Sequence, residues 1–485
     1  MSHWARINEW LEHRTGISTA VRNLFYEEIP ASSGWHQVFG SVALFLFLVQ
    51  AFTGVLLAFN YAPSPGEAYN SLQYILTEVT AGRLMRGLHH WGASMLIVVV
   101  VLHMTQVFLF GAYKKPREAT WLVGVILLLL TLAYGLTGYL LPWDNRAYWG
   151  TVVATNIAAR APLLGPYLTS LLGGKDSIGV VTFARFFALH VLLLPPATTL
   201  LILVHIYLVR KHGVAPAPGD EYVPKKRFYP EQAFKDTLAI FVAFVILFIM
   251  AVIVRVPLER AADPTDTAYT PRPEWYFLFL FQTLKFFSGS LEVVGSLVLP
   301  GLAVLLLLVV PFIDRDQVVA VTRRTFALTF VALAAIGWTA LTAAAVITTP
   351  KGANRATIDF SSPSDWLQLS PWKRYKRGYA RFAQTRPDTK RLMADYGSDI
   401  DQIWIPDMNV VDRCTTCHQG ISQPTLAGAS VPQPYRAHPI VPHQVKEWGC
   451  VICHRGQGLA TEVGEAHKTT LAWAVSYTHL TLPTN

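Results

Sequence analysis

The stretch Gly87-Leu-His-His-Trp-Gly-Ala-Ser-Met-Leu-Ile-Val-Val-Val-Val-Leu-His103 carries no Asp, Glu, Lys or Arg. Uncharged residues follow it, and the whole run is long enough, at about 1.5 Å per helical residue, to cross about 30 Å of hydrocarbon. An imidazole in a membrane is costly unless it has a partner, so His89 and His103 are functional candidates. They stand 14 residues apart, which is nearly four turns. Both therefore lie on one face of the predicted helix, about 21 Å apart.

A second uncharged run holds His190 and His205, which are 15 residues apart, again about four turns. A single buried histidine is as often a hydrogen-bonded core residue as a metal ligand. Two helices that each carry two imidazoles at matching heights instead predict two bis-histidine sites stacked across the bilayer. Haem iron takes two axial nitrogens, and a planar macrocycle fits between the helices of a bundle.

Two pairs of glycines repeat the interval of 14 residues, namely Gly40 with Gly54 and Gly124 with Gly138. A missing side chain lets a flat ring approach the backbone closely, although small residues also serve ordinary helix packing in membranes. Arg86 and Arg185 stand shortly before His89 and His190. These two arginines are candidates for contacts with haem propionates, or else plain interface anchors.

The composition indicates a membrane protein, because only 15% of the 485 residues are charged against about 25% in soluble domains. The mean hydropathy is +0.35. Seven uncharged runs are long enough to span a bilayer as helices. They are Val38–Phe59, Gly87–Ala112, Ala119–Leu141, Phe186–Val209, Thr237–Val254, Val293–Ile313 and Thr325–Ile347. The apolar run Trp275–Leu284 is too short to span.

The basic residues predict the orientation, since short cytoplasmic loops are rich in Lys and Arg. We therefore attribute the net charge of +9 to the basic loops rather than to a surface that binds nucleic acid. Three loops on one side hold Lys114, Lys115 and Arg117; Arg210, Lys211, Lys225, Lys226, Arg227 and Lys235; and Arg315, Arg323 and Arg324. We expect a cytoplasmic N-terminus without a cleavable signal peptide. Everything after about residue 349 is then extracytoplasmic.

Five motifs together resemble cytochrome b of the bc-type quinol oxidoreductases. They are Gly87-Leu-His-His-Trp91, Leu102-His103, Lys114-Lys-Pro-Arg-Glu118, Leu141-Pro-Trp-Asp144 and Pro273-Glu-Trp-Tyr276. The resemblance covers about residues 20–350. The 15-residue histidine gap and the seven spans are similar to the bf branch of photosynthesis, whose four-helix and three-helix subunits are here fused through about residues 210–236.

The resemblance implies two non-covalent b haems. His89 and His190 would hold the haem near the outer face, and His103 and His205 the haem near the cytoplasm. Glu274 would accept a proton at the site of quinol oxidation. A carboxylate in a nearly apolar pocket suits proton relay, and a surface loop glutamate is the alternative. Around it the resemblance implies a positioning role for Tyr276 and a pocket built by Trp143, Asp144, Pro273 and Trp275.

One departure from the photosynthetic branch concerns a further haem that is attached there through a cysteine. Val38 stands at that position, and the bundle has no cysteine, so we expect no third, covalent haem in the membrane. The site of quinone reduction near the cytoplasm is then poorly defined. Arg210 and Lys211 could serve it or could be only loop charge.

All four cysteines lie in two strings that are typical of c-type haem attachment, namely Cys414-Thr-Thr-Cys417-His418 and Cys450-Val-Ile-Cys453-His454. The cysteines would bind the vinyl groups, and His418 and His454 would each take one axial position. A structural zinc site is the alternative, although it rarely has both trailing histidines. Covalent haem attachment also fits an extracytoplasmic tail.

The second axial ligands of these two c haems remain open. No methionine follows Met408, so His438, His443 and His467 are the candidates, and bis-histidine ligation gives rather low potentials. The uncharged stretch Val475–Asn485 resembles nothing before it. We expect a non-native end there, with the domain truncated and no weight on His479.

The sequence thus predicts an all-α membrane protein with seven transmembrane helices, a four-helix di-haem bundle and a small loop-rich c-type haem domain. The expected parts are an N-terminal cytoplasmic segment (1–33), the b bundle (34–212), a cytoplasmic linker (213–236), a three-helix part with the quinol-site loop (237–348) and the di-haem c domain (349–485).

The predicted function is that of the cytochrome b subunit in a quinol:cytochrome c oxidoreductase of a bacterial cytoplasmic membrane. It would act with a Rieske iron–sulfur partner, and with a further cytochrome c as another candidate partner, in a homodimeric complex. The c tail would accept electrons from the iron–sulfur protein. Two alternatives are a di-haem anchor that links an extracytoplasmic dehydrogenase to the quinone pool, and a transporter whose histidines relay protons.

Overall fold

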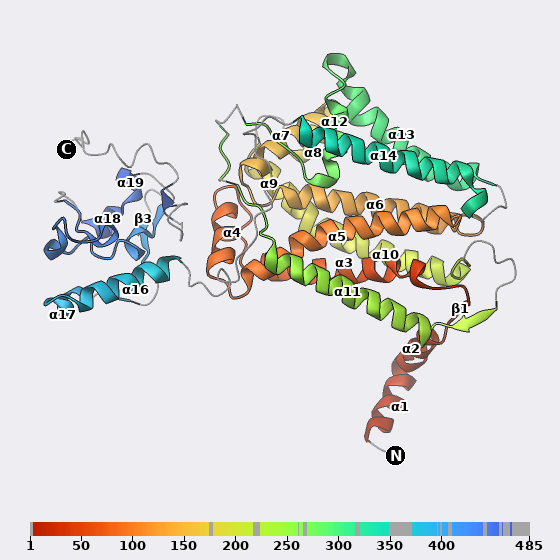
Figure 1. Cartoon of the computed structure of the whole chain (residues 1–485), viewed down its shortest axis with the longest axis horizontal. Coiled ribbons are helices and arrows are strands. Elements are labelled where there is room, and N and C mark those ends of the chain that lie inside the picture. Colours follow the sequence, from red (N-terminus) through yellow and green to blue (C-terminus); the bar gives the residue numbers. More distant parts are fainter. Residues whose placement is uncertain are drawn as a thin grey trace. The chain divides into compact units, whose positions relative to one another are not determined.

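The computed structural model describes residues 3–173, 178–216, 224–259, 261–264, 269–315, 321–348, 371–394, 396–397, 400–405, 410–439, 444–454, 458 and 466–467. The chain divides into two compact units. One comprises residues 1–59, 63–65 and 84–360, and the other residues 60–62, 66–83 and 361–485. Figure 1 shows that helices dominate the first unit.

Seven helices among the described residues are long and apolar enough to cross a membrane, as predicted, and the chain is a multi-pass membrane protein. They are α3 (Phe39–Ala58), α5 (Gly82–Leu109), α6 (Glu118–Tyr139), α9 with α10 (Val180–Ala188 and Leu194–His212), α11 (Glu231–Ile253), α13 (Leu299–Ile313) and α14 (Thr325–Ile347). The segment Trp275–Leu284 is a shorter apolar helix, also as predicted. It consists of η3 (Trp275–Phe277) and α12 (Leu278–Leu284).

Three spans extend several residues beyond their uncharged runs, because charged residues at their ends find partners. The fifth, α11, begins at Glu231 rather than Thr237, and Glu231 pairs with Lys235 at 2.7 Å. Span two begins at Gly82 rather than Gly87. Its Arg83 donates to the Leu76 carbonyl at 2.8 Å. Span four runs from Val180 to His212 and so includes charged residues at both ends. A charge-free run therefore marks the lipid-exposed middle of a span and underestimates its length.

Span four contains one wide turn, the π-helical segment η2 (Leu189–Leu193), which joins α9 to α10. Proline lacks an N–H, and its ring clashes with the carbonyl four residues earlier, so Pro195 disturbs the turn that contains Val191. A π turn relieves this clash by accommodating an extra residue. The extra residue explains why the histidines on this span are 15 residues apart and those on α5 only 14. A similar turn, η5 (Val294–Val298), precedes Pro300 in the sixth span.

The spans pack in pairs that leave α5 at the centre of the first unit (Figure 1). α6 packs against α10 and α3 against α11, and the short helix α12 packs against the span α14. One apolar core joins α3, α5 and α11 through Val42, Leu46, Leu88, Leu96, Val99, Ala243, Leu247 and Ala251. A second core contains Phe108, Tyr113, Trp121, Val125 and Ala327 and ties α5 and α6 to α14.

A polar cluster joins the ends of α5, α13 and α14. Arg324 donates to the carbonyl oxygens of Phe108 and Leu109 at 2.6 and 2.8 Å and to Asp314 at 2.8 Å. Asp314 also accepts from Lys114 at 2.9 Å. A buried guanidinium is stable only when its donors are satisfied, and this network meets that condition while linking the four-helix and three-helix parts.

Shorter elements complete the first unit. They are α1 (His3–Thr15), α2 (Ile17–Phe25), η1 (Trp35–Gln37), α7 (Asn145–Ala159), α8 (Gly165–Leu172), η4 (Gly289–Leu291), η6 (Val321–Arg323) and the strands β1 (Glu28–Pro30) and β2 (Lys225–Arg227). The two strands pair antiparallel, with Glu28 opposite Arg227.

The second unit contains α4 (Ala68–Thr77) and the elements that follow residue 370. These are α16 (Pro371–Gln384), α17 (Thr389–Leu392), β3 (Ile403–Ile405), β4 (Val410–Asp412), η8 (Cys414–Thr416), η9 (Pro424–Leu426), η10 (Gln433–Tyr435), α18 (Val445–Trp448) and α19 (Val451–His454). β3 and β4 pair antiparallel. A small apolar core consists of Tyr379, Ala383, Leu392, Leu426 and Val431.

The region after residue 370 is small and loop-rich, as predicted, although it also contains the 14-residue helix α16, which the sequence analysis did not single out. Its buried Trp372, Tyr379 and Ala383 recur at helical intervals among basic residues, and the high basic content hid this stripe. The boundary predicted at residues 348 and 349 borders residues 349–370, which lie outside the described part.

Candidate functional site

Two predicted histidines face each other across the bundle, one from α5 and one from the π turn of span four. The ring centroids of His89 and His190 lie 6.4 Å apart, with the rings at 72° to each other. Two imidazoles that bind one metal ion from opposite sides, at about 2.0 Å each, place their centroids about 6 Å apart. The observed pair therefore has the spacing of two axial ligands.

Each of the four predicted glycines contacts one of the four histidines. A Cβ on the glycine would lie at the following distance from the histidine Cε1: Gly40 to His103 3.5 Å, Gly54 to His89 3.2 Å, Gly124 to His205 3.4 Å and Gly138 to His190 2.6 Å. The glycines of α3 and α6 thus make room for the imidazole rings themselves. The sequence argument expected them to admit the porphyrin, and that role stays a prediction.

The His89 pair is oriented by two threonines. The Thr53 hydroxyl donates to the Val49 carbonyl at 2.7 Å and lies 3.0 Å from His89 Nδ1. The Thr137 hydroxyl donates to the Ala133 carbonyl at 2.8 Å and lies 2.9 Å from His190 Nδ1. Since each hydroxyl proton is already used, each Nδ1 is the donor. This tautomer leaves Nε2 as the atom that can bind a metal.

The other two histidines, His103 and His205, lack such partners. In the described part of the chain, the buried Nδ1 atoms of both residues accept or donate no hydrogen bond. The backbone of Thr120 lies near His205 without reaching hydrogen-bond geometry. His103 and His205 are near enough to interact electrostatically. The two histidine pairs therefore differ in how firmly their rings are held.

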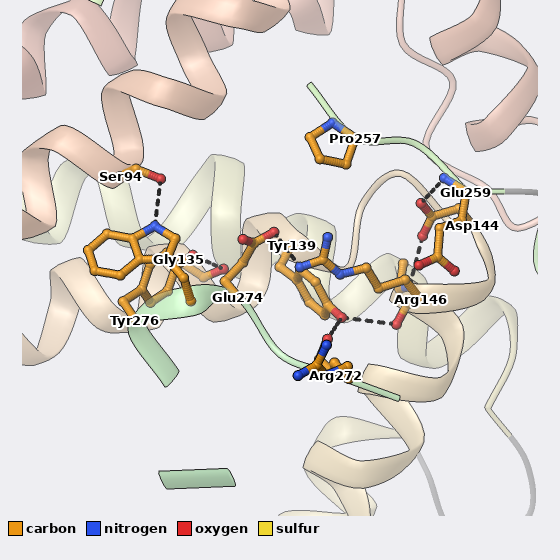
Figure 2. A network of polar contacts seen from close by, with 12 residues as sticks. Ser94, Gly135, Tyr139, Asp144, Arg146, Pro257, Glu259, Arg272, Glu274 and Tyr276 are labelled. Carbon is orange, nitrogen blue, oxygen red and sulfur yellow. Dashed lines mark hydrogen bonds and ion pairs between the residues drawn. The ribbon is translucent and has the colours of Figure 1, made fainter. Parts of the chain in front are cut away.

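Glu274 forms an ion pair with Arg146, which the sequence analysis did not single out. Arg146 Nη2 lies 3.0 Å from Glu274 Oε1, and both side chains are largely buried (Figure 2). Burial by itself lowers the pKa of Arg146, but the Glu274 carboxylate and Tyr139 raise it above its usual value. Glu274 is thus no surface residue, and its carboxylate faces a permanent positive charge.

Tyrosines surround this ion pair. The guanidinium carbon of Arg146 lies 5.1 Å from the centroid of the Tyr139 ring, and the Tyr139 hydroxyl donates to the Arg272 carbonyl at 2.8 Å. The buried Tyr276 hydroxyl lies 3.5 Å from the Gly135 carbonyl. Burial raises the pKa of Tyr276, which keeps its hydroxyl protonated. Figure 2 shows these side chains around Glu274.

The other predicted pocket residues lie beside this group. The indole of Trp275 donates to the Ser94 hydroxyl at 3.3 Å, and Pro273 is half-buried next to Glu274. Trp143 is buried with a positive φ of 49°, a strained conformation for a bulky residue. Asp144 then caps α7 by accepting from Ala147 N at 2.8 Å.

The two predicted propionate arginines use their guanidinium groups on backbone carbonyls. Buried Arg86 donates to Pro257 at 2.8 Å and to Val256 at 3.3 Å. Arg185 donates to Leu171 at 2.7 Å and also to Ser170, at the end of α8. Arg86 thus holds the segment that follows α11, and Arg185 holds the end of α8. A contact of either arginine with propionates stays a prediction.

A buried carboxylate lies near the second histidine pair. Asp236 of α11 is 9% exposed and accepts from the Ser41 hydroxyl and the Gln232 amide, both at 2.8 Å. Ser41 follows Gly40, which contacts His103. An ionisable residue inside a span is a functional candidate by default. Arg210, which the sequence argument offered for this region, instead pairs with Glu27 at 3.2 Å.

The second unit brings the two cysteine strings together. Cys414, Cys450 and Asp412 offer ligand atoms that all lie within 4.8 Å of one another. The neighbouring Cys450 raises the pKa of Cys414, and burial raises the pKa of Cys417 to about 11. Burial also lowers the pKa of His418 and His454, so both imidazoles are neutral near pH 7. His443 lies outside the described residues.

Comparison with known families decides the class of the first unit. Residues 28–213 match the family described as cytochrome b/b6/petB, and residues 261–358 match cytochrome b (C-terminal)/b6/petD. Together the two matches cover more than half of the chain. This chain belongs to the cytochrome b family. A chain of a solved structure titled "Hyperthermophilic respiratory Complex III" is 29% identical with a TM-score of 0.62, over 74% of this cytochrome b and 93% of that chain.

Cytochrome b binds two b haems, and the residues of the first unit fit that requirement. Two histidine pairs lie at two levels of one bundle, and a glycine contacts each imidazole ring. In the pair of His89 and His190, the hydrogen bonds at Nδ1 fix the tautomer that leaves Nε2 free to bind iron. Sequence reasoning missed Thr53, Thr137 and Arg146. The threonines directly precede Gly54 and Gly138, and Arg146 is a charge between two apolar segments, so both signals were present.

We expect Gly138→Val to remove one of the two b haems from this cytochrome b. The Cβ would lie 2.6 Å from His190 Cε1, so the ring must leave its position against α6. A pyridine haemochrome assay should find about half of the wild-type b haem. Gly337→Val on α14 is the control, because nothing lies within 4 Å of a Cβ there. Full b haem content in Gly138→Val would contradict the assignment.

We expect Thr53→Val and Thr137→Val each to raise the midpoint potential of the haem between His89 and His190. A hydrogen bond from Nδ1 makes the imidazole a stronger donor to oxidised iron, and its loss, worth about 1 kcal/mol, corresponds to about 40 mV. Redox titration would measure both b haems. Thr131→Val is the control, since among the described residues the Thr131 hydroxyl bonds the Leu127 carbonyl and no histidine. Equal shifts of both haems would argue against the hydrogen bonds as the cause.

Proposed function

We propose that this cytochrome b is the quinol-oxidising subunit of a complex III-like assembly in a bacterial cytoplasmic membrane. The observation that carries the proposal is the joint presence of two stacked histidine pairs and a buried, ion-paired Glu274. The likeness to a chain of a respiratory complex III supports it. A homodimeric complex with a Rieske iron–sulfur partner belongs to the same proposal.

His89 with His190 would hold the haem at the outer level, and His103 with His205 the haem at the cytoplasmic level. When bound, the two haems supply one-electron acceptors in a line across the membrane. The protein keeps the four histidines aligned, because the glycines of α3 and α6 allow the rings to lie close to the helix backbones. The orientation follows from the basic loops.

At the outer site, Glu274 would take a proton from the quinol. Oxidation of one quinol to quinone releases two electrons and two protons, with one electron passing to the iron–sulfur partner and one into the membrane. A carboxylate can accept the proton of a quinol hydroxyl once its oxygen turns from Arg146. Tyr276 stays protonated and available as a hydrogen-bond donor. Arg146 would hold the Glu274 side chain in place until the quinol binds.

Near the cytoplasm, Asp236 and Ser41 are the groups best placed to meet a quinone. Quinone reduction consumes two electrons and two protons, so its site needs a proton-carrying group close to the second histidine pair. Asp236 is buried and hydrogen-bonded to Ser41, whose neighbour Gly40 contacts His103. Arg210 is tied to Glu27 and suits a loop role.

The C-terminal unit would carry two c haems and accept electrons from the iron–sulfur partner, in place of a separate cytochrome. Its two cysteine strings and their trailing histidines support this part. The family match removes the transporter alternative. The membrane anchor for an extracytoplasmic dehydrogenase remains, and it has no use for the pair of Glu274 with Arg146.

We expect Glu274→Gln to slow quinol oxidation about 100-fold, the scale of general base catalysis, and Glu274→Asp to retain part of the rate. Quinol-dependent reduction of an added electron acceptor by the purified complex would measure this. Glu292→Gln is the control, because Glu292 is ion-paired with Arg160 but more exposed. Wild-type turnover in Glu274→Gln would favour the membrane anchor.

We expect Asp236→Asn to slow the reoxidation of the b haems by quinone at least tenfold while their first reduction by quinol keeps its rate. The amide oxygen can still accept from Gln232 and the amide nitrogen can donate to Ser41 Oγ, but the side chain carries no proton to the quinone. Stopped-flow absorbance of the b haems separates the two phases. Glu231→Gln, on the same helix and more than half exposed, is the control. Unchanged reoxidation would place the quinone elsewhere.

A further inference from the structure

Two histidines outside the cysteine strings each face one of the trailing histidines. The ring centroids of His418 and His467 are 6.1 Å apart at an angle of 87°. Those of His438 and His454 are 5.8 Å apart at 74°. Both distances are close to the 6.4 Å of His89 and His190. The sequence alone offered three candidates without an order.

The two pairs have the composition that a pair of axial ligands needs. Packed rings in general lie 4.5–7 Å apart, so the distance by itself is not decisive. Each pair, however, joins the histidine of one cysteine string to a histidine from outside both strings, and the two pairs share no member. His438 Nδ1 also lies 2.8 Å from the Pro439 carbonyl, which fixes Nδ1 as the donor and leaves Nε2 for a metal.

One buried carboxylate connects the two cysteine strings. Asp412 is fully buried at the end of β4. Its Oδ1 accepts from Cys414 N at 2.8 Å, and its Oδ2 accepts from Val451 N at 2.8 Å and from Cys450 N. Gly449, with a φ of +63°, leaves no room for a Cβ beside this carboxylate. The first cysteines of the two strings are therefore held side by side.

We propose that the C-terminal unit holds two c haems in edge contact, with His418 and His467 as axial ligands of one and His454 and His438 as axial ligands of the other. This assignment rests on the proposed c-type attachment. Each cysteine thiol adds across one vinyl double bond, so that an S–C bond forms, the thiol proton goes to the other vinyl carbon, and no oxidant is consumed. Since Cys414 and Cys450 are adjacent, the attached edges of the two porphyrins meet.

The contact gives the unit a function of its own. Electron exchange between haems is fast when their edges touch, so the pair would act as one acceptor for two successive electrons from the outer site. Asp412 is the positioning residue, because its three backbone hydrogen bonds fix the distance between the strings. An unpaired buried carboxylate would be costly, and these bonds offset that cost.

The ligand assignment can be tested on the full chain in its purified complex by resonance Raman spectroscopy and haem analysis. Wild type should contain two c haems per chain, both low-spin. His467→Ala and His438→Ala should each turn one of them high-spin, and His443→Ala neither. With the second string removed by Cys450→Ala and Cys453→Ala, the remaining haem should turn high-spin with His467→Ala and stay low-spin with His438→Ala.

The reverse pattern, or a high-spin haem in His443→Ala, would overturn the ligand assignment while leaving the proposed function intact. Absence of c haem with one zinc per chain would instead overturn the proposed attachment itself. If an alanine variant loses haem altogether, His467→Met and His438→Met provide the test. Methionine can occupy the axial position and should raise the midpoint potential of that haem. A potential unchanged in both would count against the assignment.

Edge contact has a separate readout. Two nearby oxidised haems couple magnetically, so the electron paramagnetic resonance spectrum of wild type should differ from the sum of two single-haem spectra. The single-haem variants are Cys414→Ala with Cys417→Ala, and Cys450→Ala with Cys453→Ala. Asp412→Asn should weaken the coupling while both haems stay low-spin. Additive spectra would show that the two haems are apart.

Discussion

The close approach of imidazole rings to helix backbone is the interaction on which the membrane part depends. His89 and His190 can face each other at 6.4 Å only because Gly54 and Gly138 leave space for their rings. The threonines fix the tautomer of these two histidines. Helices α3 and α6 carry the glycines behind the rings, and they pack against α11 and α10. Replacing one of these glycines should therefore displace a histidine ring before it disturbs the fold.

The seven spans and their histidine interval could be predicted from the sequence, because lipid imposes length and charge limits that a simple count detects. The π turn at Leu189–Leu193 was present as the 15-residue gap, but its meaning depends on a hydrogen-bond pattern that no composition reveals. Several ends of the spans were misjudged, at Gly82, Val180, His212 and Glu231, since whether a charged residue finds a partner depends on contacts that the folded chain makes.

The segment from Pro273 to Tyr276 likewise has features that the sequence predicted and contacts that it did not. The motif Pro273 to Tyr276 marked the segment that we propose for quinol oxidation, yet Arg146 stands far away in the sequence and meets Glu274 only through folding. Asp236 likewise lies in a helix that the histidine argument did not involve, and only its bond to Ser41 brings it near His103. Spacing arguments work along one helix. They do not predict contacts between distant segments, and proton-carrying groups usually depend on such contacts.

The two units hold their histidine and cysteine side chains in position by different interactions. Inside the membrane, the ligand rings are held by the stiffness of long helices, and the backbone satisfies its own hydrogen bonds. The C-terminal unit has short elements and a small apolar core, which is too little to fix four cysteines and four histidines. Backbone hydrogen bonds to Asp412 and the reciprocal bonds between Thr416 and Asp401 at 2.9 Å take that role. Under the proposed c-type attachment, each porphyrin would complete this core by supplying apolar surface that the chain lacks.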